Sequence, residues 1–358
     1  MTQDENKVVV FIRRPGANGI PTVDCFATES CPEPTENELT EGQCIIKSLY
    51  LSVDPALRCM MNESTGVNYI SPWELNRPIK GLGGIGEVLH TAVNCQLSVG
   101  DLVTSADMIW PWSKRFVSDD KAMKKVNLPN DQSPSIVLSC LGMIGLTSLL
   151  GIQKKGRIDP SKKQTLVVSG AAGACGSLAG QIGRLEGCQL VVGICGSEEK
   201  CEVLVNQLGF DAAVNYKTPD VAEKLKASCP NGIDVYFDNV GGLVSDVVIS
   251  QMNENGSVIL CGQIAVYNED LPYPPPIPQE TQDALNQRNI QRDRFTVVNY
   301  PEDFAGGLQL LGQWVQEGRL KVLETVADGI ENTGQAFVDM MNGRNTGKQL
   351  IKVAERNG

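Results

Sequence analysis

The chain has 358 residues, of which 42% are hydrophobic and 20% are charged, and its formal net charge is −11. A chain of this length predicts two domains with sizeable cores. The negative net charge argues against binding of nucleic acid or of an anionic membrane surface.

The sequence also argues against export and against a metal centre. The N-terminal residues MTQDENK lack the basic and apolar regions of a signal peptide. We expect no membrane insertion, because no apolar run approaches the ~20 residues of a span. The 12 cysteines include no CxxC pair and the only histidine is His90, so we expect free thiols, no metal site and a structural histidine. A cytoplasmic protein is the expectation.

The first 130 residues or so contain short β-like runs separated by turns, at 7–11, 43–51, 81–88 and 100–104. Strands at such short spacing predict a compact barrel-like domain. The apolar stretch 135–150 predicts one buried helix that leads into a second domain.

From residue 165 the chain alternates between strand-like and helical segments, which is typical of a doubly wound parallel sheet. The alternating segments are 166–168, 177–186, 190–194, 200–208, 212–216, 221–227, 233–238, 244–252 and 256–261. Further on we expect a strand at 295–299 and a helix at 304–317. The last strand, at 350–353, is expected to return to the first domain.

Glycines 170, 173 and 176 lie between the first strand and the first helix of this alternation, in a GxxGxxG spacing. Small residues there let backbone N–H groups approach a phosphate at the helix N-terminus, so a strand–loop–helix–strand unit predicts dinucleotide binding. An NAD site needs a carboxylate at the end of the second strand. Cys195 and Gly196 stand at that point instead and Lys200 follows, which favours the 2′-phosphate of NADPH. The residues alone leave open that Lys200 is an ordinary solvated lysine.

Motifs spread over most of the chain resemble a known family. They are LYLSVDPALRCMMNE (49–63), YISPWEL (69–75), VVSGAAGACGSLAGQIG (167–183), VGICGSEEKC (192–201), LGFDAAVNYK (208–217), DVYFDNVGG (234–242), ISQMNENG (249–256) and YPPP (273–276). Together they resemble the zinc-independent branch of the medium-chain dehydrogenase/reductase superfamily, which includes the NADPH-dependent 15-oxoprostaglandin reductases.

The resemblance implies a Rossmann domain that binds NADPH (133–305) and a β-rich GroES-like catalytic domain (1–132, completed by 306–358). It implies that the cofactor contacts Gly173, Ala174, Cys175, Gly176, Lys200, Tyr216, Asn239, Cys261, Gly262, Gln263, Ile264, Ala265, Val266, Tyr267, Phe295, Thr296, Val297 and Asn345. The residues alone would also fit a strand aromatic at 216, a turn asparagine at 239 and a loop residue at 345.

The same resemblance gives Tyr267 the catalytic role, because a phenol can donate a hydrogen bond to a carbonyl oxygen as enolate charge develops. The alternative is a loop tyrosine that packs on the proline-rich segment. Substrate would contact Tyr69, Met108, Ile109, Tyr267, Thr296, Val297 and Val298. Met108 and Ile109 replace an aromatic pair of the family before Trp110-Pro111-Trp112, so the substrate wall is altered.

The implied reaction is NADPH-dependent reduction of the conjugated carbon–carbon double bond of a lipid-like enone, a 15-oxo-prostaglandin. The alternatives are a quinone or general alkenal reductase on the same scaffold, and an NADPH-binding protein without catalysis. We expect a monomer or a homodimer whose partner is a small-molecule substrate.

Overall fold

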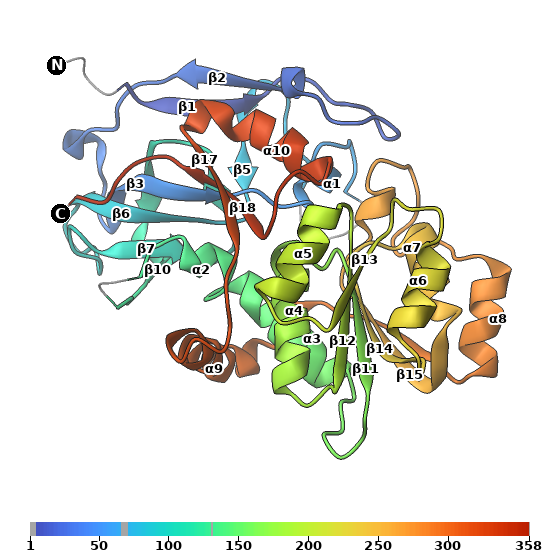
Figure 1. Cartoon of the computed structure of the whole chain (residues 1–358). Coiled ribbons are helices and arrows are strands. Elements are labelled where there is room, and N and C mark those ends of the chain that lie inside the picture. Colours follow the sequence, from blue (N-terminus) through green and yellow to red (C-terminus); the bar gives the residue numbers. More distant parts are fainter. Residues whose placement is uncertain (1–4, 66–70, 130–131, 358) are drawn as a thin grey trace. The chain divides into compact units, whose positions relative to one another are not determined.

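The computed structural model describes residues 5–65, 71–129 and 132–357, and the chain divides into two compact units (Figure 1). The first unit comprises Met1–Leu138, Asn268–Asp270 and Thr325–Gly358, and the second comprises Ser139–Tyr267 and Leu271–Glu324.

This division and the expected domain boundaries place three segments differently, 133–138, 268–270 and 306–324. The helix α9 (Phe304–Gln316) belongs to the second unit because it packs on α3 (Met143–Lys155): a Cβ at Gly307 would lie 2.7 Å from Leu146 Cδ2. The short segment 268–270 belongs to the first unit, where the Arg58 Nε donates a hydrogen bond of 2.9 Å to Asn268 Oδ1.

The first unit is built on three sheets in which most strand pairs are antiparallel. In the seven-stranded sheet the order is β10 (Met123–Lys125), β7 (Leu102–Ser105), β6 (Gly84–Thr91), β3 (Gln43–Ser52), β18 (Lys348–Lys352) and β17 (Glu324–Asp328), and β9 (Arg115–Asp119) also pairs with β3. A second sheet holds β2 (Phe26–Ser30), β1 (Lys7–Phe11) and β4 (Arg77–Pro78), and a third holds β5 (Lys80–Gly81) and β8 (Trp110–Pro111). The helices are α1 (Leu57–Met60) and α10 (Thr333–Met341). The prediction that the last strand returns to the first domain is confirmed, because Ile351 pairs with Leu51.

Aromatic side chains fill the core of the first unit. Phe11, Phe26, Trp73, Trp112 and Phe337 form a connected cluster whose neighbouring ring centroids lie 5.4–6.5 Å apart. Tilted and edge-on aromatic contacts of this kind add to the free energy of burial. The cluster joins residues from the first and last parts of the chain into one core.

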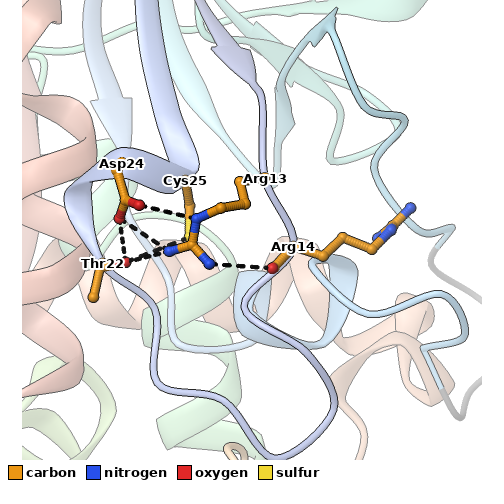
Figure 2. Close-up of polar contacts among 5 residues, drawn as sticks. All are labelled: Arg13, Arg14, Thr22, Asp24 and Cys25. Atoms are coloured by element: carbon orange, nitrogen blue, oxygen red, sulfur yellow. Dashed lines mark hydrogen bonds and ion pairs between the residues drawn. The ribbon is translucent and has the colours of Figure 1, made fainter.

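On the surface of the first unit, an arginine closes the loop between β1 and β2 (Figure 2). The Arg13 guanidinium donates to both carboxylate oxygens of Asp24, at 2.9 and 3.0 Å, and to Thr22 Oγ1 at 2.6 Å. Asp24 also accepts a hydrogen bond from the Thr22 hydroxyl. The bonds from Arg13, and after them the bond from Thr22, lower the pKa of Asp24 to about 2.

The second unit contains one six-stranded parallel sheet. Its strand order is β13 (Ala212–Asn215), β12 (Leu190–Cys195), β11 (Thr165–Ser169), β14 (Ile233–Asp238), β15 (Met252–Leu260) and β16 (Gln291–Arg294). The helices are α3, α4 (Ala174–Leu185), α5 (Glu198–Asn206), α6 (Val221–Ser228), α7 (Gly242–Ile249), α8 (Gln279–Gln287) and α9. The predicted fold class, a doubly wound parallel sheet with a β-rich domain, is confirmed.

Two predicted elements are wrong in detail. The strand expected at 295–299 lies earlier, at β16, and a 3₁₀ turn occupies Val297–Asn299. The stretch expected to form one helix from 135 to 150 forms α2 (Ile136–Ser139) and α3, with a break at Gly142, whose backbone is extended at φ −161°.

The same stretch differs from the expectation that no apolar run approaches the length of a membrane span. The segment Ile136–Lys155 is long and apolar enough to cross a membrane by length and composition alone, with a mean hydropathy of 1.9. The fold buries 61% of its most apolar window, and the core helices of globular proteins meet the same criterion. Its apolarity is therefore accounted for by burial inside the protein.

Candidate dinucleotide-binding site

The candidate site lies at the carboxyl edge of the parallel sheet, where the strand order reverses. From β11 the chain continues to β12 and β13 on one side, and then to β14, β15 and β16 on the other. Loops that leave two such strands in opposite directions open a crevice at the switch point. Asn239 joins the two loops here, because its Nδ2 donates to Ser169 O at 2.7 Å.

The glycine loop after β11 is shaped for close backbone contact. Gly170 has φ +58°, a left-handed conformation that glycine adopts without strain. A Cβ at Gly176 would lie 2.3 Å from Gly170 O, so the turn closes only with glycine there. The N-cap of α4 is Gly173, which has no side chain to accept a capping bond, and Ala174, Cys175 and Gly176 follow in the first turn. N–H groups in a first turn have no intrahelical acceptor, and they are suited to a pyrophosphate.

Two lysines converge at the ends of β12 and β13. Burial and then the nearby charge of Lys217 lower the pKa of Lys200, while Cys195 acts in the opposite direction. Lys217 Nζ lies 6.0 Å from the centre of the Tyr216 ring. A Cβ at Gly196 would come within 3.0 Å of Tyr216 Cε1, so this glycine makes room for the ring.

Lys217 lies beside the predicted 2′-phosphate contacts and is not among the residues predicted from the sequence. The ribose-binding position at the end of the second strand points to Lys200 and not to the cation that follows Tyr216. The sequence signal was present, because Tyr216 and Lys217 end the AAVNYK run after the third strand. Two ammonium groups beside a helix N-terminus favour a doubly charged phosphate.

The segment after β15 folds back over the end of β14. Cys261 N and Gly262 N both donate to Asp238 O, at 2.9 and 3.0 Å. A 3₁₀ turn follows at Ile264–Val266, in which Ala265 is exposed. The Tyr267 hydroxyl accepts a long bond of 3.4 Å from Gln263 N, so the predicted catalytic phenol lies against its own turn.

Two thiols meet between this segment and the glycine loop. A hydrogen bond with Cys175, then burial, raise the pKa of Cys261 well above the usual thiol value. The structure therefore brings the predicted pyrophosphate loop beside the predicted nicotinamide segment. Both thiols are free cysteines.

The side chains of the four residues after β16 differ in their solvent exposure. The Phe295 ring is 5% exposed and stacks on Tyr300 at 5.7 Å between ring centres. Thr296 and Val297 are half-buried, and Val298 is 39% exposed. The ring of Phe295 packs in the core of the second unit, and contacts of these four residues with cofactor or substrate stay predictions.

The remaining predicted site residues belong to the first unit or lie outside the described residues. Met108 has φ +60°, and the side chain of Ile109 is 45% exposed. Asn345 Nδ2 donates to Gly347 O at 2.8 Å, and Asn345 lines a cavity of about 300 Å³ with Thr325, Arg344 and Gln349. Tyr69 lies outside the described residues.

Potential metal ligands are scattered. Within residues 5–65, 71–129 and 132–357, no group of three or more His, Cys, Asp or Glu side chains is arranged to hold a metal ion. His90 lies on β6 and is 44% exposed, with its Nδ1 2.6 Å from Glu36 Oε1. His90 therefore lies at the surface of the β-rich unit, paired with a glutamate.

The fold and this edge define a dinucleotide-binding oxidoreductase of the two-domain α/β type. A family model described as "Zinc-binding dehydrogenase" matches residues 174–312, and one described as "N-terminal domain of oxidoreductase" matches residues 7–126. The chain belongs to the medium-chain dehydrogenase/reductase superfamily.

Relatives match over nearly the whole chain. An NADP-dependent oxidoreductase of Bacillus subtilis is 37% identical, over 99% of both chains. The NADPH-dependent curcumin reductase of Escherichia coli is 32% identical over 98% of both, and prostaglandin reductase 1 of Bos taurus is 33% identical over 93% of this chain and 95% of its own. The crystal structure of CurA from Vibrio vulnificus with NADPH superposes with a TM-score of 0.87, at 31% identity, over 98% of this chain and 99% of that chain.

Proposed function

We propose that this protein reduces the conjugated carbon–carbon double bond of a lipid-like enone with NADPH, and that 15-oxo-prostaglandins are its substrates. The protein is an NADP-dependent oxidoreductase by family, and its cofactor is NADPH. The observation that carries the cofactor assignment is the pair Lys200 and Lys217 beside Tyr216, at a strand end where an NAD site would place a carboxylate.

The cofactor supplies a hydride for the β-carbon of the enone, and a proton completes the saturated ketone. The protein's own part is to hold the phosphates and to stabilise the oxygen. The first turn of α4 would hold the pyrophosphate, and Lys200 and Lys217 the 2′-phosphate. The Tyr267 phenol would donate a hydrogen bond to the carbonyl oxygen as enolate charge develops.

Support for the prostaglandin substrate comes from the motifs in the sequence, which resemble those of prostaglandin reductase 2, a 15-oxoprostaglandin 13-reductase. The 33% identity to prostaglandin reductase 1 of Bos taurus is consistent with this proposal. The wall formed by Met108 and Ile109 is the point at which substrate preference would differ from that of such relatives.

A broader enone or alkenal reductase is the second candidate. The similarity to a curcumin reductase supports it, because that relative's name describes a different conjugated enone. The exposed side chain of Ile109 supports it too, since an aliphatic residue at that position lacks the flat face of an aromatic one.

The test is a comparison of turnover with NADPH across a 15-oxo-prostaglandin of the E series, curcumin, short alkenals and quinones. We expect the highest kcat/KM with the prostaglandin, and a 13,14-dihydro product. NADPH deuterated at the transferable position of C4 should place deuterium on C13, the β-carbon. Higher kcat/KM with curcumin or alkenals would favour the second candidate, and reduction of the carbonyl would contradict both.

A further inference from the structure

Asp238, the last residue of β14, is completely buried at the carboxyl edge of the parallel sheet. Among the described residues its carboxylate accepts hydrogen bonds from six groups, all of them uncharged. At Oδ1 they are Ser169 Oγ (3.1 Å), the Tyr236 hydroxyl (2.8 Å), Val240 N (3.0 Å) and Gly241 N (2.9 Å), and at Oδ2 they are Ser245 Oγ (2.8 Å) and Gln263 Nε2 (3.1 Å). A buried carboxylate is tolerated only when its lone pairs are satisfied in this way.

The donors include residues from three of the segments that carry predicted cofactor contacts. Ser169 ends β11 just before the glycine loop, and Gly241 lies in the loop after β14. Gln263 lies in the segment after β15, and a Cβ at Gly241 would come within 2.3 Å of its Oε1. One carboxylate therefore holds all three loops at the switch point together.

Asp238 also lies beside the N-terminus of a helix. Gly241 is the N-cap of α7, with φ +73°, and the N–H groups of Val240 and Gly241 both point at Asp238 Oδ1. At α4 the N-cap Gly173 provides no side-chain acceptor. Of these two helix N-termini, the one at α7 already has an anion of the protein itself.

We propose that Asp238 is a positioning residue for the dinucleotide site: it fixes the loops after β11, β14 and β15 relative to one another and lies beside the N-terminus of α7, so that the pyrophosphate binds at α4. This inference rests on the proposed NADPH-dependent function. From the sequence alone, residues 233–238 predict a strand and residues 234–242 form one of the family motifs, but neither assigns a role to Asp238.

The test is Asp238→Asn, which keeps the shape and replaces one acceptor oxygen by an NH2 group that faces donors. We expect Kd for NADPH to rise at least tenfold, measured by titration of NADPH fluorescence. The affinity for 2′-AMP should stay within twofold of wild type, because 2′-AMP has no pyrophosphate and the predicted 2′-phosphate contacts lie at the ends of β12 and β13. A general loosening of the fold would weaken both ligands.

Tyr236→Phe is the matched control. It removes one donor to the same carboxylate, but Tyr236 lies within β14 and its bond to Asp238 joins no loop. We expect a lower Tm and a Kd for NADPH within twofold of wild type. An equal loss of NADPH affinity in both variants would overturn the positioning role, because it would show that any damage to the network has the same effect.

Two other results would overturn the proposal: a Kd for NADPH within twofold of wild type in Asp238→Asn, or an equal weakening of NADPH and 2′-AMP. If Asp238→Asn does not fold, Ser169→Ala replaces it, since it removes the hydroxyl that donates to Asp238 Oδ1 and accepts from Asn239 N just before the glycine loop. That variant should weaken NADPH at least threefold and leave 2′-AMP unchanged, and unchanged NADPH binding would overturn the proposal. Absence of NADPH binding by the wild-type protein would instead overturn the proposed function itself.

Discussion

Lys200 and Lys217 lie near enough for the charge of one to lower the pKa of the other. Two like charges held together repel each other, and a bound dianion relieves that repulsion. Lysine 217 is exposed and lies on the Tyr216 ring, so it can reach a 2′-phosphate from the open side of the site.

We predict that Lys217→Ala lowers the preference for NADPH over NADH about tenfold, equivalent to ~1.4 kcal/mol of lost charge-assisted bonding. The measurement is kcat/KM for both cofactors. Lys226→Ala removes an equally exposed lysine from α6 and should leave the ratio unchanged. An unchanged ratio in Lys217→Ala would place the 2′-phosphate elsewhere.

The Asp24 carboxyl gives a pH prediction in the first unit. Arg13 first, then Thr22, lower its pKa from 3.8 to about 2 (Figure 2). Because the pKa is lower in the folded state, the stabilising contribution is fully present above the ordinary value near 4. It is lost as the pH falls from there through about 2.

We expect Arg13→Met to return the pKa of Asp24 toward 3.8, as measured by NMR titration of the side-chain carboxyl. Both side chains are exposed, so the Tm at pH 7 should change little. A pKa that stays near 2 in the variant would show that Thr22 alone accounts for the shift, and Thr22→Val would then test that bond.

At the scale of elements, the turn between β11 and α4 tolerates only glycine at its tightest point. A Cβ at Gly176 would lie 2.3 Å from Gly170 O and 2.8 Å from Ala171 Cα, both of which are backbone atoms. Backbone atoms cannot swing aside as a flexible side chain can. The start of α4 would have to move away from the carboxyl edge of the sheet.

We therefore predict that Gly176→Ala abolishes measurable NADPH binding and lowers Tm, as followed by fluorescence titration and thermal unfolding. Gly306→Ala is the matched control, since Gly306 is exposed on α9 and a Cβ there meets nothing within 4 Å. It should stabilise the protein by about 0.5–1 kcal/mol and leave binding unchanged. Normal NADPH affinity in Gly176→Ala would contradict the role given to this turn.

The sequence predicted those elements whose pattern matches their environment. The strands β11 and β12 are buried on both faces, and their sequences contain the continuous apolar runs LVV and LVVGIC. β16 was missed because its residues are QRDR: an edge strand with one neighbour needs no apolar side chains. The helix break at Gly142 was missed because it interrupts no apolar pattern.

The same contrast holds within the site. Glycines 170, 173 and 176 were found because their spacing has a physical reason that is visible in one dimension. Asp238 was not, since its role depends on Ser169 and Gln263, which are brought to it from other strands. Contacts of this kind come from the fold and leave no local pattern.

At the scale of the whole molecule, the first unit depends on the end of the chain. β18 lies between β3 and β17, and its residues Leu350 and Ile351 are completely buried. Their burial alone contributes about 3–6 kcal/mol, which is comparable with the ~5–15 kcal/mol that separates folded from unfolded domains.

We predict that a chain ending at Gly347 does not form a folded first unit, because β3 and β17 lose the strand between them. The near-UV circular dichroism of the aromatic cluster should be lost, or the protein should be insoluble. A chain ending at Glu355 keeps β18 complete and should retain the signal. Retention of the signal by the shorter chain would show that the sheet closes without its last strand.

Because β3 pairs with β18, the sheet of the first unit cannot be completed until the ribosome has synthesised β18. β3 ends at Ser52 and β18 begins at Lys348, so 295 residues lie between them. At about 5–20 residues per second, the ribosome takes about 15–60 s to make that stretch. The β-rich unit is thus begun first and completed last, and during that interval an unpaired edge of β3 is open to mispairing with other chains. We expect chaperones that bind nascent chains to act mainly on this unit during synthesis.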